Sequence, residues 1–325
     1  MPVPPRPLPQ SLGDEFSVVD ALAAGASAGR LRAKDLRRPF HGVRVRPERP
    51  EPDTNEPPTK YELALRTEAR KALAYLEVMS PHSFFAGRTA CVLRGAAIDP
   101  GHELVVATRA PNRAPRGAGI RGIKVAPKLV HVRDHDGMRM ATPTSTWAML
   151  GAELSVRELV VLGDSIVRVP RDERGTLLPD ERLGTIAQLE RAITSGRRMG
   201  IRKLRVALPL IRVGSASPLE TEYRLDAAEE GLPEPELDVE IRDGRGDLLG
   251  ISEVVYKRYR TVVEIEGDHH RTDRAQWNRD IDKYATYAAE GWEVVRLTSA
   301  HIRGTSPRAV GIVRSVLLRR GWAPG

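Results

Sequence analysis

The stretch Val262-Val-Glu-Ile-Glu-Gly-Asp-His-His270 begins as an apolar strand and ends in acidic and imidazole side chains around one glycine. Side chains alternate between the two faces of a strand, so Glu264 and Glu266 share one face and the apolar residues the other. Two carboxylates at this spacing repel each other, and a divalent cation would reverse that effect. His270 adds a group that titrates near neutral pH. The stretch therefore predicts a metal-dependent hydrolytic site, with solvated acids at a strand end as the alternative.

Composition sets the broad class of the chain. With 325 residues and 41% hydrophobic content it is long enough for two domains, and it has no apolar run of the roughly 18 residues that span a membrane. The start, Met1–Gln10, has no apolar signal-peptide core, and the single Cys91 excludes an internal disulfide, so a cytoplasmic location is expected. The net charge of +8 is carried mostly by arginine, which favours phosphate-bearing partners such as DNA.

Four segments are expected along the chain. Residues 1–16 form a proline-rich disordered lead, and residues 17–46 give two short helical patches around a small-residue turn. That second segment fits a reduced helix-turn-helix, or a small helical cap on the next domain. Residues 60–205 indicate a mixed α/β module that serves as a scaffold or recognition domain, and residues 206–325 a separate domain.

The C-terminal segment has the clearest pattern of elements. Ser217-Pro-Leu-Glu220 predicts a capping box, in which the serine hydroxyl and the glutamate carboxylate each accept a backbone N–H. Periodicity and the glycine and proline stops predict the order α-β-β-β-α-β-α. The expected ranges are helix 217–231, strands 237–242, 248–256 and 261–266, helix 277–290, strand 293–298 and helix 307–320.

Several spaced motifs in this segment carry a family resemblance. They are Ser217-Pro-Leu-Glu-Thr-Glu-Tyr-Arg224, Gly231-Leu-Pro233, Ile251-Ser-Glu253, Val263-Glu-Ile-Glu-Gly-Asp-His-His270, Asp280-Ile-Asp-Lys283 and Gly291-Trp-Glu-Val-Val-Arg296. Together they resemble the PD-(D/E)XK restriction-endonuclease-like fold, and most closely its Vsr-like branch of bacterial domains. The earlier stretch Asp35-Leu-Arg-Arg-Pro-Phe-His-Gly-Val43 weakly resembles antitoxin-like proteins of the abortive-infection AbiEi type, which often carry such a domain at their C-terminus.

The resemblance implies a set of site residues. Catalytic roles fall on Glu220, Glu253, Glu264, Glu266 and His270, and nucleic-acid contacts on Arg271, Lys283 and Arg296. Glu253 and Glu264 would hold Mg²⁺ or Mn²⁺, which neutralises phosphate charge and acidifies a water. Simpler roles also fit: Glu220 as the capping acid, and Lys283 as the ion-pair partner of Asp280 one helical turn away.

The sequence departs from the family pattern at the centre of the site. Glu253 stands where aspartate is usual, and Lys283 where arginine is usual. The third motif position, usually lysine, is Glu266, so a basic partner must come from His270 or Lys257. Degenerate members of such folds keep the sheet and lose the chemistry.

Two functions from different classes follow from these observations, with a purely structural interaction protein as a third possibility. The first is a metal-dependent DNA endonuclease of a bacterial defence or toxin–antitoxin type. The alternative is a non-catalytic DNA-binding regulator or antitoxin that uses a degenerate nuclease fold. DNA is the expected partner in both, with a cognate toxin or self-association as further possibilities, and neither a membrane nor a small-molecule cofactor is expected.

Overall fold

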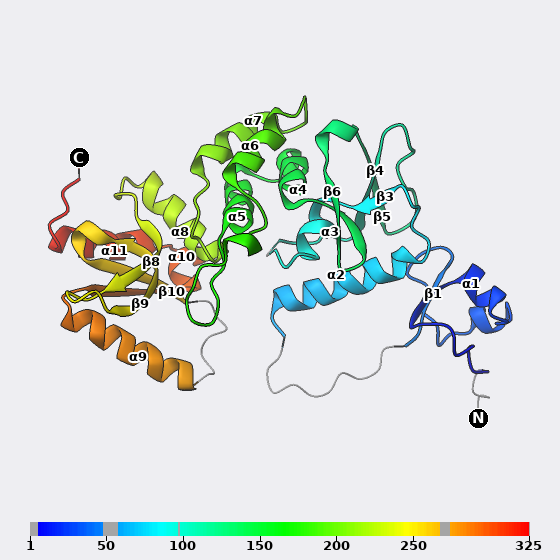
Figure 1. Ribbon diagram of the computed structural model, residues 1–325, viewed down its shortest axis with the longest axis horizontal. Helices are drawn as coiled ribbons and strands as arrows, with labels where there is room; N and C mark the ends of the chain where they lie inside the picture. Colours follow the sequence, from blue (N-terminus) through cyan, green and yellow to red (C-terminus); the bar gives the residue numbers. More distant parts are fainter. Residues whose placement is uncertain (1–5, 48–57, 97, 267–273, 325) are drawn as a thin grey trace. The chain divides into compact units, whose positions relative to one another are not determined.

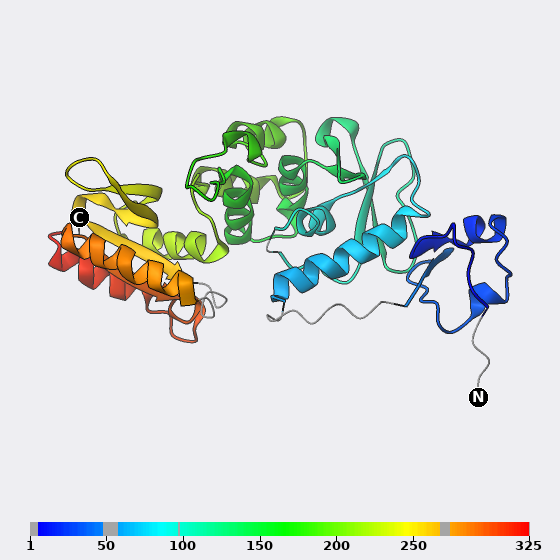
Figure 2. The ribbon, with the colours of Figure 1, turned by 60° about the horizontal axis from the view of Figure 1, so that its bottom comes forward.

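The computed structural model describes residues 6–47, 58–96, 98–266 and 274–324 of the chain (Figures 1 and 2). These residues form a mixed α/β protein with three sheets. The chain divides into two compact units, unit 1 (Met1–Leu150 with Thr194–Arg198) and unit 2 (Gly151–Ile193 with Met199–Gly325). In the ranges described, every helix is too short or too polar to cross a membrane.

Unit 1 begins with a small module that differs from the predicted helix-turn-helix. Strand β1 (Glu15–Ser17) pairs antiparallel with β2 (Val43–Val45), and α1 (Val18–Ala23) follows β1 directly. The second predicted helix is only a 3-10 turn, η1 (Arg30–Arg32). The helix-turn-helix prediction for residues 17–46 is therefore wrong, because their apolar residues, among them Ala21 and Leu31, pack with Leu8 and Phe16 into a local core instead.

The rest of unit 1 is a five-stranded sheet with helices. Its elements are α2 (Lys60–Leu76), β3 (Ser83–Phe85), α3 (Gly87–Val92), β4 (Leu104–Arg109), β5 (Ile120–Val125), β6 (Val132–His135), β7 (Met138–Ala141) and α4 (Pro143–Met149). The strand order is β5-β4-β3-β7-β6, so β5 lies at one edge. The central strands are apolar on both faces because each face is covered: Val106 packs toward α2, and Val105 into a second core.

Unit 2 begins earlier than the predicted boundary at residue 206. Its helical part comprises α5 (Val156–Val167), α6 (Ile186–Thr194), α7 (Ile201–Ala207) and α8 (Pro218–Glu229). The last residue of α6 and the four that follow it, Thr194–Arg198, belong to unit 1. Helix α5 packs against α8 through a buried ion pair between Asp164 and Arg224, and this joins the segment from Gly151 to the C-terminal sheet. The division between residues 205 and 206 is corrected accordingly.

The C-terminal sheet carries four strands in the order β11-β10-β9-β8. Its elements are β8 (Glu236–Arg242), β9 (Leu248–Tyr256), β10 (Thr261–Glu266), α9 (Arg274–Ala289), β11 (Glu293–Thr298), α10 (Ser299–Arg303) and α11 (Ala309–Arg319). The elements follow the predicted order, apart from the short added helix α10. One face of β10 packs on α8 and α11 through Val263, and the other on α9 through Val262 (Figure 1).

Candidate active site

The candidate site lies where strands β9 and β10 stop pairing. Their antiparallel register runs from Thr261 opposite Tyr256 to Val263 opposite Val254 and then ends. The next position on each strand is a glutamate, Glu253 on β9 and Glu264 on β10. The Glu253 carboxylate accepts a hydrogen bond from the Ile265 N–H at 2.8 Å. The Glu253 side chain of β9 thus accepts a hydrogen bond from the main chain of β10, just beyond the last residue at which the two strands pair.

Glu220 reaches the same region from the first turn of α8. The Ser217 hydroxyl accepts the Glu220 N–H at 3.3 Å, which is half of the predicted capping box. The other half differs, because the Glu220 carboxylate accepts the N–H of Ala216 at 2.6 Å rather than that of Ser217. Glu220 is only 2% exposed, and burial raises its pKa to about 6. It is therefore more than a surface capping acid.

Three carboxylates influence one another here. Burial raises the pKa of Glu253 to about 8, and the charges of Glu220 and Glu264 act in the same direction. The Ile265 N–H and the Lys283 ammonium oppose these effects and do not cancel them. A region with this much negative charge and little solvent favours a cation or a proton.

The structure places a side-chain cation on each glutamate of β10. Lys283 of α9 donates to the Glu264 carboxylate at 3.1 Å and to the Ile251 carbonyl at 2.7 Å. Arg296 of β11 donates to Glu266 at 2.6 Å. The repulsion on this strand face is therefore relieved within the chain. Two of the three cations predicted to contact nucleic acid, Lys283 and Arg296, thus pair with acids of the site, and the third, Arg271, lies outside the described residues.

Asp238 of β8 is a site neighbour that the sequence did not reveal. Its φ of +53° is left-handed, which is strained for a residue with a side chain, and the β8–β9 register skips it. Arg171 donates to both carboxylate oxygens, at 2.8 and 2.9 Å. The Asp238 charge raises the pKa of Glu220 further, whereas Arg168 lowers it. The alternating Leu-Asp-Val-Glu pattern gave no sign of this irregularity.

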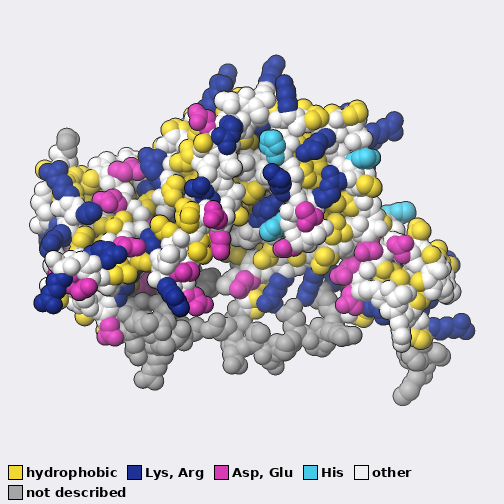
Figure 3. Space-filling model, in the orientation of Figure 1, with side chains coloured by type: hydrophobic (Ala, Val, Ile, Leu, Met, Phe, Trp, Pro, Cys, Tyr) yellow, Lys and Arg dark blue, Asp and Glu magenta, His cyan; other side chains and the backbone are white. Residues whose placement is uncertain are grey.

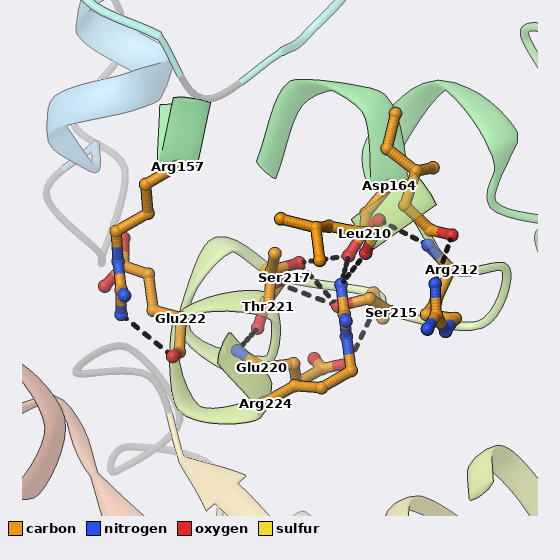
Figure 4. A network of polar contacts seen from close by, with 12 residues as sticks. Arg157, Asp164, Leu210, Arg212, Ser215, Ser217, Glu220, Thr221, Glu222 and Arg224 are labelled. Carbon is orange, nitrogen blue, oxygen red and sulfur yellow. Dashed lines mark hydrogen bonds and ion pairs between the residues drawn. The ribbon is translucent and has the colours of Figure 1, made fainter. Parts of the chain in front are cut away.

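A buried polar network fixes α8, the helix that carries Glu220 (Figure 4). Asp164 of α5 receives the Arg224 guanidinium and the Thr221 hydroxyl, each at 2.9 Å, on one carboxylate oxygen. Its other oxygen accepts the N–H of Arg212 at 2.8 Å. Burial raises the pKa of Asp164 even so. The sequence gave no signal for this network, because its two charged members lie 60 residues apart.

His270 and Arg271 lie outside the described residues, as does the Asp280 side chain. Among the side chains that the structure does describe, no three His, Cys, Asp or Glu residues are placed to bind one metal ion. Glu253 and Glu264 remain as a neighbouring pair of carboxylates. Mg²⁺ is commonly held in proteins by one or two carboxylates, with water and substrate phosphate completing its coordination.

Comparisons with known proteins place the chain near two curated proteins. The uncharacterised proteins MT2308 and Rv2248, from the Mycobacterium tuberculosis strains CDC 1551 / Oshkosh and H37Rv, are each 28% identical to it over 118 residues. The match covers 36% of this chain and 43% of each relative, so the chain spans less than half of their length. No family model and no solved structure matches the chain.

Proposed function

We propose that unit 2 is a metal-dependent phosphodiester hydrolase acting on DNA, with a restriction-endonuclease-like domain of the Vsr-like type. The observation that carries the proposal is the approach of Glu220, Glu253 and Glu264 at the separation of β9 and β10. Buried like charges are unfavourable without a counter-charge, and such groupings are typical of functional sites. The order of helices and strands around them supports the resemblance stated from the motifs.

The residues present fit a hard divalent cation. Glu253 and Glu264 would hold it, since both offer carboxylate oxygens, and Glu253 keeps a second oxygen besides the one bonded to Ile265. Bound Mg²⁺ supplies charge neutralisation at the phosphate and acidifies a water. Glu220, fixed by the Ala216 N–H, adds negative charge that strengthens cation binding.

Lys283 is the basic partner that the motif lacks at its third position. Sequence reasoning assigned this role to His270 or Lys257, whereas Lys283 donates directly to Glu264. The Lys283 side chain is only 21% exposed, and its ammonium is oriented by a hydrogen bond to the Ile251 carbonyl. In the proposed enzyme Lys283 orients Glu264 and stabilises negative charge that develops on the phosphate.

One observation favours the alternative, a non-catalytic DNA-binding regulator. Glu264 and Glu266 already have cationic partners, so protons on Glu253 and Glu220 would leave the site near neutrality without any metal. In this alternative the sheet is a binding platform only. A cognate toxin or a second copy of the chain would then be the further partner.

A cleavage assay separates the two functions. The purified chain is incubated with supercoiled plasmid and with single-stranded DNA, in Mg²⁺, in Mn²⁺ and in EDTA. The variants are Glu264→Gln and Lys283→Gln, and Glu229→Gln, an exposed acid on α8, is the matched control. The hydrolase requires metal-dependent cleavage that falls at least about 100-fold in both site variants and stays intact in the control.

The alternative makes the opposite forecast. The wild type would bind DNA and leave it intact under every metal condition, and Lys283→Gln would change binding little. Cleavage that persists in Glu264→Gln at the wild-type rate would rule out this site and point to a contaminating nuclease.

A further inference from the structure

One stretch of unit 1 is strongly basic and has no acidic residue. Residues 104–133 contain no Asp or Glu. Their cations are Arg109, Arg113, Arg116, Arg121, Lys124, Lys128 and Arg133. The stretch comprises β4, the loop after it, edge strand β5, the turn η2 (Pro127–Leu129) and the start of β6. In Figure 3, Lys and Arg side chains project at the upper right, in the part of the view where Figure 1 labels β4 and β5.

The loop between β4 and β5 is held against the edge strand. Pro115 crosses β5 so closely that a Cβ on Gly122 would lie 1.8 Å from the Pro115 carbonyl oxygen. The Thr108 hydroxyl donates to the Arg113 carbonyl at 3.2 Å, and the Ala110 N–H to the Val125 carbonyl at 2.9 Å. The backbone that carries Arg113 and Arg116 is therefore ordered while their side chains are exposed.

Three of these cations, Arg113, Arg116 and Lys124, are not neutralised by the protein. In the part of the chain that the structure describes, Arg113, Arg116 and Lys124 are exposed and make no ion pair. Many cations of unit 2 behave differently, since Arg242, Arg314 and Arg319 each pair with a glutamate at 2.6–2.7 Å. The positive charge near β5 is thus available to an outside partner.

Two half-buried arginines, one of them from outside this stretch, add charge beside the turn that follows β5. Arg109 donates to the Val130 carbonyl at 3.5 Å, and Arg198 to the Leu129 carbonyl at 3.3 Å. Their Nε atoms are buried without an acceptor, and burial lowers the pKa of Arg198. Both guanidiniums are thus held by carbonyl dipoles on consecutive residues, with no carboxylate partner among the described residues. A buried guanidinium without an acid is poorly neutralised and attracts anions.

Edge strands often carry a lysine that keeps them from pairing with other chains. One or two charges are enough for that purpose, whereas here seven cations occur in 30 residues without an acid. Closely spaced arginines and lysines match the regular phosphates of a nucleic acid. We propose that the β5 surface, defined by Arg113, Arg116, Lys124 and Lys128, binds the phosphodiester backbone of a nucleic acid. The inference rests on the proposed function and deepens it, since it assigns nucleic-acid binding to residues of unit 1, whereas the carboxylates belong to unit 2.

Binding to the full chain in EDTA tests the inference without cleavage. Fluorescence anisotropy is measured over a series of salt concentrations, with a DNA duplex, the DNA single strand and an RNA of the same sequence. The variant Arg113→Gln/Arg116→Gln/Lys124→Gln removes three charges from the β5 surface. The control Arg242→Gln/Arg314→Gln/Arg319→Gln removes three charges from ion pairs elsewhere, so the two proteins have equal net charge.

The β5 variant is expected to bind at least about tenfold more weakly, and its slope of log affinity against log salt to fall by about 2–3, roughly one per lost phosphate contact. The control should stay within about threefold of wild type. Equal weakening of both variants, or none in the β5 variant, overturns the proposal. The nucleic acid that the wild type binds most tightly shows whether the surface recognises duplex DNA, single-stranded DNA or RNA. A failed cleavage assay with intact binding would overturn the proposed hydrolase and leave this surface standing.

Discussion

At Glu253, burial and two neighbouring carboxylates act in the same direction and raise the pKa to about 8. The unfolded chain has no such environment, so its carboxyl titrates near the ordinary value. Between these two pKa values the folded state binds more protons than the unfolded state. The contribution of Glu253 to the stability of the fold therefore decreases as pH rises through this window, and it is most favourable below the unfolded pKa.

Glu253→Gln tests this sign in EDTA. The amide keeps an oxygen for the Ile265 N–H and removes the charge, so the variant should exceed wild type in stability by about 1–3 kcal/mol at pH 9. Near pH 4.5 the two proteins should converge, because the wild-type carboxyl is then largely protonated. Thermal melts at both pH values measure the difference, with Glu229→Gln as the exposed control. A difference of the same size at both pH values would contradict the assigned pKa.

At the scale of elements, α8 is positioned by charges inside the protein. Arg224 and Asp164 have side chains only 3% and 1% exposed, and they link α8 to α5. A buried ion pair contributes little net stability compared with apolar residues, yet removing one partner leaves an uncompensated charge. The same two helices are also joined near the surface, where Arg157 pairs with Asp226 at 2.6 Å.

These two pairs give a matched prediction. Asp164→Asn should destabilise the protein by about 3–5 kcal/mol, because Arg224 stays buried without its counter-charge. Arg157→Gln should cost no more than about 1 kcal/mol, since the partners are partly exposed and solvated. Urea unfolding measures both. Similar losses in the two variants would show that the buried network does not anchor α8.

Elements with a strong local pattern could be predicted from the sequence. Strands 261–266 and 293–298 have the predicted bounds, because alternating apolar residues lie between clear stops such as Gly291. The role of Lys283 could not be predicted, since it depends on how α9 lies across β10. The same holds for Arg224, whose partner belongs to a helix assigned to the other domain. Long-range polar contacts leave little trace in local periodicity.

For the whole molecule, the position of the unit boundary is the main consequence of the structure. A fragment of residues 151–325 contains α5 and both members of the Asp164–Arg224 pair. A fragment of residues 206–325, cut at the boundary expected from sequence, leaves Arg224 without Asp164. The charged Arg224 side chain in that fragment would then lack its carboxylate partner, whether it stays buried or becomes exposed to water.

The two fragments should therefore behave differently. Residues 151–325 should unfold cooperatively in urea, whereas residues 206–325 should be less stable by about 3–5 kcal/mol or fail to fold. Circular dichroism during urea unfolding compares them. Leu189 and Leu204, buried on α6 and α7, provide additional apolar packing that only the longer fragment retains. Equal stability of the two fragments would support the domain boundary at residue 206.

The hydrogen bond from the Ile265 N–H to Glu253 has a spectroscopic consequence. An amide proton shared with a carboxylate resonates further downfield than one shared with the protonated acid, because charge strengthens the bond. This single backbone signal therefore follows the charge of the neighbouring side chain, and its midpoint against pH should lie near the Glu253 pKa of about 8. A cation at the same carboxylate would move that midpoint downward. The chemical shift of the Ile265 amide proton therefore reports whether a cation occupies the acidic site.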